Sequence, residues 1–240
     1  MKHLFRLSYL PFFTAGAGIF GFILRLWLFA AIDEKGLLPA RHIACTLLYL
    51  LSALVLAVAF LSTRKSSAIP FPRKTMRIPH ALAYAFTGIM MLITFFQGVT
   101  LSAVSLAKLA TLVCACSAIL SLITAFLIWT GKPVIYPFPA LFTVSLILIT
   151  VALCQVWGAE PQLQIYFFPL LASVFSILTA YQATTLAAGQ PKRRLLAFFS
   201  QSALFFCCLS LNTYQWPLYL GLAFWAAAQV IPCYRYKKES

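Results

Sequence analysis

The sequence predicts an all-α fold, a polytopic bundle of about eight transmembrane helices. Its residues are 62% hydrophobic and only 9% charged, whereas soluble domains are about half apolar and about a quarter charged. Apolar runs recur along the chain, each close to the roughly 20 residues that a helix needs to cross a bilayer. Short basic clusters separate these runs. No stretch is left for a soluble domain, so we expect a single transmembrane domain over 1–240.

Prolines mark the limits of the predicted spans, because a missing N–H is tolerated near a helix end. Pro11 opens the first span, Pro39 precedes the second, Pro79 opens the third, Pro133 follows the fourth, Pro137 opens the fifth, Pro161 precedes the sixth, Pro191 precedes the seventh, and Pro217 and Pro232 lie near the ends of the eighth. The spans are then about 10–31, 43–62, 79–98, 105–129, 136–156, 163–186, 195–211 and 215–234. Pro169 alone lies well inside a span and predicts a kink there.

The distribution of Lys and Arg predicts the orientation. With the N-terminus inside, fourteen of them fall on the cytoplasmic side and three, Lys35, Arg41 and Lys108, on the outer side. So strong a bias in short loops indicates that both termini are cytoplasmic, with an even number of spans. The net charge of +14 is therefore a topology signal, and we expect no nucleic-acid partner.

The second loop, which the predicted orientation places on the cytoplasmic side, carries five basic residues among prolines and serines: Arg64, Lys65, Arg73, Lys74 and Arg77. Each basic residue near a membrane contributes about 1 kcal/mol of attraction to anionic lipid. We expect this loop to contact the inner leaflet. A plainer interpretation, that the loop only sets topology, explains it as well.

Arg25 is the one charge inside a predicted span, and intramembrane charges are usually functional. Gly18, Gly21 and Arg25 share one helix face, and Phe29 continues it. One interpretation is a packed groove that leads to a guanidinium available to an anionic ligand. The plainer one, given the short distance to the interface, is that Arg25 snorkels toward the headgroups or toward Asp33 and Glu34.

Uncharged polar residues inside the spans either fasten helices together or line a wet cavity. They are Tyr84, Thr87, Gln97, Gln155, Tyr181, Gln182, Gln201, Asn212, Gln215 and Gln229. If Gln97 and Gln155 face Arg25 across the outer half of the membrane, the three form a pocket for a small anionic or zwitterionic ligand. This is the hypothesis of a transporter-like or ligand-binding protein. The alternative is a non-catalytic scaffold or subunit that recruits a membrane protein or a second copy.

Gly16, Gly18 and Gly21 lie in a segment with the spacing of a dinucleotide-binding loop. That loop requires a preceding strand and an acidic residue about 20 positions later, and the context here is an apolar helix. Small residues instead allow helices to approach closely in a membrane. We expect the three glycines to serve helix packing.

The chain has few side chains that could catalyse a reaction. The chain has four acids and three histidines, no acid lies within a span, and no nucleophile has an adjacent base. Its seven cysteines lie in or at the ends of apolar spans, where a thiol behaves as a small hydrophobe. We therefore expect no enzyme, no metal site and no cofactor.

Two predicted hairpins resemble each other internally. Phe86-Thr87 and Leu92-Ile93-Thr94 in the third span recur in the fifth span, and Ser121 to Phe126 in the fourth recurs as Ser176 to Tyr181 in the sixth. The offsets are nearly equal, which predicts a tandem duplication of a helical hairpin. Two spans in each repeat preserve orientation, so the repeat is parallel.

One segment resembles a family of uncharacterised bacterial polytopic membrane proteins. It comprises Leu24-Arg25-Leu26-Trp27-Leu28 and Asp33-Glu34-Lys35-Gly36-Leu37-Leu38-Pro39, which belong to the first span and its loop. The resemblance implies a bacterial plasma (inner) membrane location and no assigned activity.

Overall fold

The structure is a computed structural model that describes residues 10–31, 42–63, 77–101, 105–132, 137–157, 163–188 and 193–234. These residues form eight α-helices: α2 (Leu10–Ala30), α3 (Ile43–Thr63), α4 (Arg77–Leu101), α5 (Ser105–Thr130), α6 (Pro137–Trp157), α7 (Leu163–Ala187), α8 (Arg193–Leu209) and α9 (Trp216–Tyr234). Each helix coincides with a predicted span, and its ends differ from the predicted ones by no more than three residues. The prediction of an all-α polytopic bundle is confirmed.

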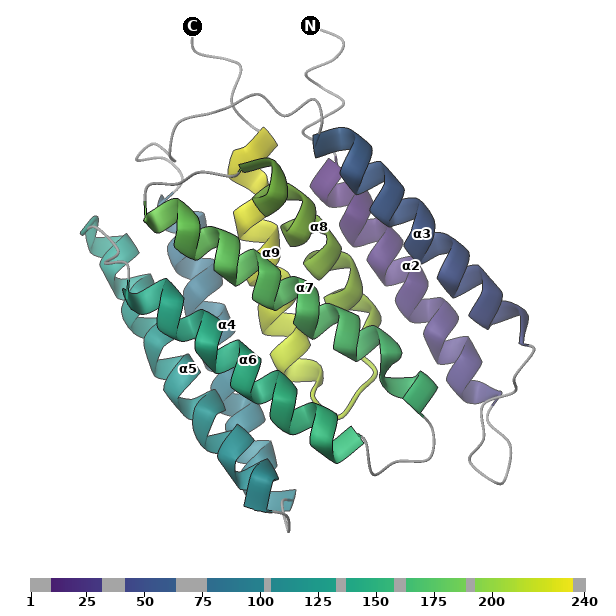
Figure 1. The fold of residues 1–240 in the computed structure, drawn as a ribbon, viewed down its shortest axis with the longest axis horizontal. Coiled ribbons are helices and arrows are strands. Elements are labelled where there is room, and N and C mark those ends of the chain that lie inside the picture. The colour runs from purple at the N-terminus through teal and green to yellow at the C-terminus, as the bar shows by residue number, and fades with distance from the viewer. Residues whose placement is uncertain are drawn as a thin grey trace, which may run out of the picture.

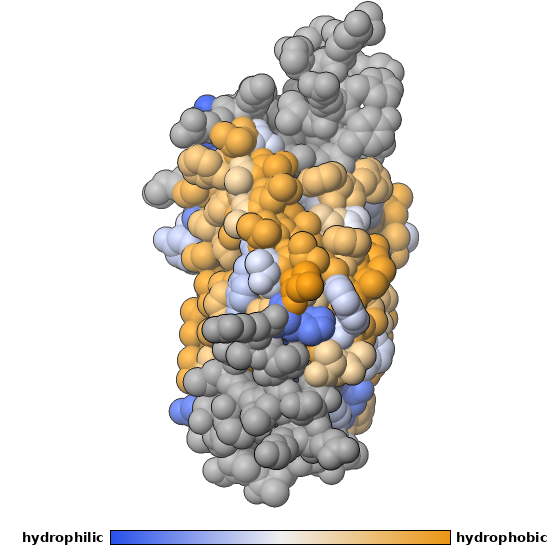
Figure 2. All heavy atoms as spheres, turned by 90° about the vertical axis from the view of Figure 1, so that its right-hand side faces the viewer, coloured by the Kyte–Doolittle hydropathy of each residue, from blue (hydrophilic) through white to orange (hydrophobic). Residues whose placement is uncertain are grey.

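Six of these helices, α2 to α7, are long and apolar enough to cross a membrane. Their outward faces carry large hydrophobic side chains, for example Phe20 on α2 and Leu112 on α5. Figure 2 shows the side of the molecule formed by α2 and α3, where hydrophobic side chains cover most of the described surface. The chain is therefore a multi-pass membrane protein.

Helix α8 is the centre of the bundle. It packs against α7, α9, α2 and α3, and every residue from Ser200 to Ser210 is buried. Its 17 residues give a length of about 25 Å, less than the roughly 30 Å of a bilayer core. Neighbouring helices shield α8 from lipid, which explains why it tolerates Ser200, Gln201 and Ser202 along its length.

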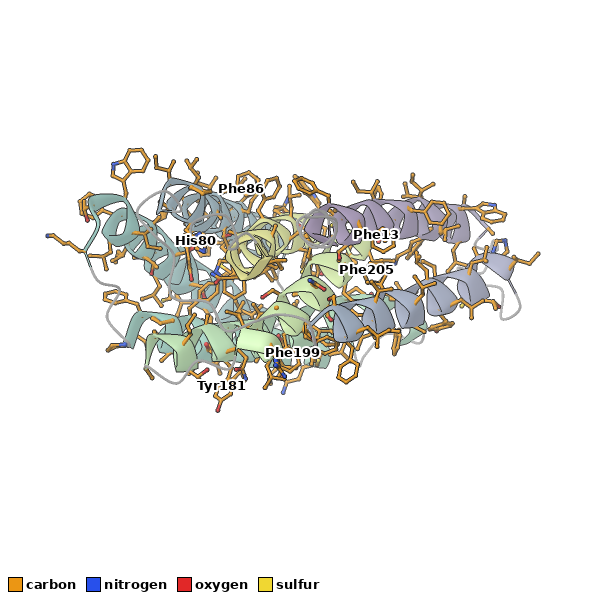
Figure 3. The ribbon with its side chains drawn as sticks, turned by 90° about the horizontal axis from the view of Figure 1, so that it is seen from above. Phe13, His80, Phe86, Tyr181, Phe199 and Phe205 are labelled. Carbon is orange, nitrogen blue, oxygen red and sulfur yellow. The ribbon has the colours of Figure 1, made fainter. Side chains whose placement is uncertain are left out.

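Apart from α7, which packs against α6 and α8, the remaining helices form two groups on either side of α8 and α9 (Figure 1). Helices α4, α5 and α6 lie on one side, and α9 packs against α4. The α2–α3 hairpin lies on the other side and joins the rest chiefly through α8. Seen from above, Phe205 of α8 lies inside the bundle, while Tyr181 of α7 projects from its edge (Figure 3).

The first residue of α2 and the last residue of α9 lie at the same end of the bundle (Figure 1). An even number of passes requires this arrangement. Arg77 at the start of α4 and Arg193 at the start of α8 belong to that end as well. The cytoplasmic assignment of this end is still a prediction from the charge bias.

Candidate functional site

Two glycines of α2 determine how closely it approaches α8. A Cβ on Gly18 would lie 2.7 Å from the Cβ of Cys208, and a Cβ on Gly21 would lie 3.0 Å from Cδ2 of Leu209. Only glycine fits at these two positions without displacing a neighbour. Gly16 differs, because a Cβ there would meet nothing within 4 Å. The close contact brings Arg25, four residues after Gly21, to the C-terminal end of α8.

Arg25 is buried at this junction, with 1% of its surface exposed. Its Nη1 donates a hydrogen bond to the backbone oxygen of Leu209 at 2.7 Å, and its Nη2 donates to the backbone oxygen of Ile165 at 2.6 Å. These lengths are at or slightly below the range of charge-assisted hydrogen bonds. Of the two interpretations of Arg25, the one in which its side chain snorkels toward the headgroups does not hold, because the side chain is buried where α2, α7 and α8 meet. Asp33 and Glu34, its predicted acidic neighbours, lie outside the described residues.

Aromatic rings complete the surroundings of the guanidinium. The Cζ atom of Arg25 lies 5.4 Å from the centroid of the Phe29 ring and 5.7 Å from that of Phe168. Both distances are within the range of a cation–π interaction. Leu209 is the last residue of α8, where the helix dipole places partial negative charge. Carbonyl dipoles and aromatic ring faces thus stabilise the Arg25 cation. The described residues include none of the four acids of the chain.

Tyr219 of α9 also bonds to the backbone of α7, near the point where Arg25 bonds to it. Its side chain is fully buried, and its hydroxyl donates to the backbone oxygen of Pro169 at 3.3 Å. The Oγ of Ser173 lies 3.4 Å from the same hydroxyl. Tyr219 was not among the polar residues predicted to matter inside the spans. The signal that would have found it is a phenol inside an apolar span, since a buried tyrosine hydroxyl usually has a partner.

The structure does not bring Gln97 and Gln155 to Arg25. Gln97 is half-buried near the end of α4, and its backbone oxygen accepts a hydrogen bond from the Tyr214 hydroxyl at 3.2 Å. Gln155 is exposed on α6. Helix α2 packs against α3, α8 and α9, whereas α6 packs against α5 and α7. The two described amides and the guanidinium therefore belong to different parts of the bundle.

Other buried polar side chains connect helices. Thr87 of α4 donates to the backbone oxygen of Gly221 in α9 at 2.9 Å. Gln229 of α9 donates to the Tyr84 hydroxyl at 3.4 Å, and Ser121 of α5 donates to the Tyr84 backbone oxygen at 2.7 Å. Polar residues inside the spans were expected either to fasten helices together or to line a wet cavity. These contacts fasten one helix to another.

Several predicted residues cannot be placed. Arg64, Lys65, Arg73 and Lys74 lie outside the described residues, and Arg77 is described only as the first residue of α4. Among the described side chains, no group of three His, Cys, Asp or Glu is arranged to hold a metal ion. No family model, curated protein or solved structure matches this chain.

Proposed function

We propose that this multi-pass protein is a non-catalytic membrane subunit, a scaffold for a larger assembly, and that it does not carry a ligand through Arg25. The observation that supports this proposal is the pair of hydrogen bonds from Arg25 to the backbone of α7 and α8. An arginine that binds a ligand needs N–H groups directed into the ligand's space. Here both terminal nitrogens donate to the protein's own backbone.

The energetics favour this structural role. A hydrogen bond that involves a charged group contributes about 1.5–3 kcal/mol, and an unsatisfied backbone group in lipid costs several kcal/mol. The guanidinium retains three further N–H groups, but its side chain is only 1% exposed, so an anionic ligand that reached them would have to separate the helices packed around Arg25. Arg25 therefore serves the packing of three helices better than it serves exchange of a ligand.

A subunit also needs a surface for its partner, and α2 offers one. Phe12, Ile19 and Phe20 are exposed on its outer face, and Gly16 lies between them with open space above its Cα. A small residue among large ones allows a second helix to approach closely. The partner class that we propose is a transmembrane helix of another membrane protein or of a second copy.

We further propose that the protein resides in the plasma membrane of a bacterium, with its basic end in the cytoplasm. The support is the charge bias of the loops and the resemblance of the first span to bacterial membrane proteins. The basic residues from Arg64 to Arg77 would then face the anionic lipids of the inner leaflet.

Native mass spectrometry of the chain extracted from its own membranes in a mild detergent tests the proposal. We expect an assembly that contains a further polypeptide, or a second copy, in fixed stoichiometry. Gly16→Leu should release that partner, because a large side chain fills the gap on α2, while Leu112→Ala on the outer face of α5 should retain it. A single chain that carries a small anion, which Arg25→Lys loses, would instead establish the ligand-binding alternative.

A further inference from the structure

The two carbonyl groups that accept from Arg25 have each lost the helical N–H that would normally bond to them. In an α-helix, the oxygen of residue i accepts from the N–H of residue i+4. For Ile165 that residue is Pro169, which lies inside α7 and has no N–H. The chain therefore creates an unsatisfied acceptor within one turn of the proline.

Leu209 has lost its donor for a different reason. The N–H at position i+4 belongs to Thr213, which follows the end of α8 and bonds to the oxygen of Ser210 at 3.1 Å. The oxygen of Leu209 is thus one of the orphan carbonyls at a helix C-terminus. Two orphan acceptors, one from a proline and one from a helix end, come together at the same guanidinium.

We propose that Pro169 and the C-terminal end of α8 form a binding site for one planar guanidinium cation, and that Arg25 is its built-in ligand. The two carbonyl oxygens match the fork of Nη1 and Nη2, which presents donors in a fixed plane. The rings of Phe29 and Phe168 supply the aromatic contacts that favour a cation. Arg25 and Pro169, 144 positions apart in the sequence, are then one energetically coupled pair. This inference does not depend on the proposed subunit role.

The proposal predicts that a free cation can replace the side chain. Arg25→Ala removes the atoms that N-ethylguanidinium contains, so this molecule fits the vacated site. In the purified full chain in detergent, we expect millimolar N-ethylguanidinium to raise the Tm of Arg25→Ala by about 2–4 °C, the shift that corresponds to about 1 kcal/mol in a chain of this size. Wild-type protein should show no rise, and ethylammonium, which lacks the planar fork, should raise the Tm of Arg25→Ala less.

A proline control tests whether Pro169 creates the acceptor. In Arg25→Ala with Pro169→Ala, the new N–H at position 169 bonds to the Ile165 oxygen, so the rescue should shrink. In Arg25→Ala with Pro217→Ala, the rescue should persist, because Pro217 lies in the first turn of α9, where no helical N–H is needed. An equal rescue in both double variants, or none in Arg25→Ala, would overturn the proposal.

A second measurement applies even if Arg25→Ala does not fold. Arg25→Lys keeps the charge and loses the fork, and its loss of Tm should be smaller in the Pro169→Ala background than in wild type. The Pro217→Ala background should leave that loss unchanged. The same loss in all three backgrounds would show that Arg25 and Pro169 are not coupled, and the inferred site would be wrong.

Discussion

At the scale of single residues, Arg25 donates hydrogen bonds to two backbone oxygens that would otherwise have no donor. Such unsatisfied acceptors are especially costly in a lipid bilayer. Water is absent from the bilayer core, so each backbone carbonyl must find its donor within the protein. The guanidinium supplies two donors at once to Leu209 and Ile165. Burial of a charge is normally costly. Here hydrogen bonds and the rings of Phe29 and Phe168 offset that cost.

Gly18 and Gly16 provide a matched pair of substitutions on α2. Gly18→Ala would place its Cβ 2.7 Å from Cys208, so α2 and α8 must separate, and we expect a loss of about 1–3 kcal/mol. Gly16→Ala meets no atom within 4 Å and should leave the stability of the isolated chain nearly unchanged. Thermal unfolding of both variants in the same detergent measures the difference. Equal losses would contradict the close packing of α2 on α8.

At the scale of helices, α8 differs from the others because every one of its residues from Ser200 to Leu209 is buried. Phe206 is fully buried, and its ring stacks on Phe175 at a centroid distance of 5.3 Å with an interplanar angle of 5°. It also stacks on Phe168, the ring beside Arg25, at 6.5 Å. The ring of Phe206 on α8 thus holds Phe168, one of the two rings that contact the Arg25 guanidinium.

Truncation of an aromatic ring should reveal the central place of α8. Phe206→Ala removes a ring that is 0% exposed, and we expect a loss of about 3–5 kcal/mol. Phe20→Ala, in which the ring is 55% exposed on α2, should cost far less, since lipid or detergent fills the space. Chemical denaturation in mixed micelles compares the two. A larger effect of Phe20→Ala would mean that α8 is not the core of the bundle.

The predicted hairpin repeat relates α4–α5 to α6–α7, and repeated residues share environments. Thr124 and Thr179 are both buried, and each donates to the backbone oxygen four residues earlier. Phe126 and Tyr181 are both exposed, at 62% and 53%. These positions agree in burial, and the duplication itself stays a prediction from the sequence. The match has limits, since Ser121 donates to the neighbouring helix α4 and Ser176 to its own helix.

At the scale of the whole molecule, most of the basic residues should lie on one side of the membrane, and Lys108 is one of the three predicted on the other side. Lys132 follows the end of α5, and Lys108 lies near its start, so the two mark opposite ends of one helix. We expect an impermeant maleimide to label Lys108→Cys in intact cells and Lys132→Cys only after permeabilisation. Wild-type protein, with its native cysteines, sets the background. Labelling in the reverse order would invert the predicted topology.

The positions of the helices were predictable from the chain because apolar length is a local property. Each run from Leu10 to Tyr234 that is long enough to cross lipid became a helix within three residues of its predicted ends. The importance of Arg25 was predictable for a similar reason, since a charge in an apolar run stands out. Pro169, inside its span, was also visible as a feature that needed an explanation.

The partners of Arg25 were not predictable, because they are backbone oxygens 140 and 184 positions away and no side chain marks them. Neither was the central place of α8, nor the separation of Gln155 from Arg25. In water, hydropathy distinguishes the core from the surface. In lipid, the surface is as apolar as the core, so the packing of the helices in space alone distinguishes residues that face protein from residues that face the membrane.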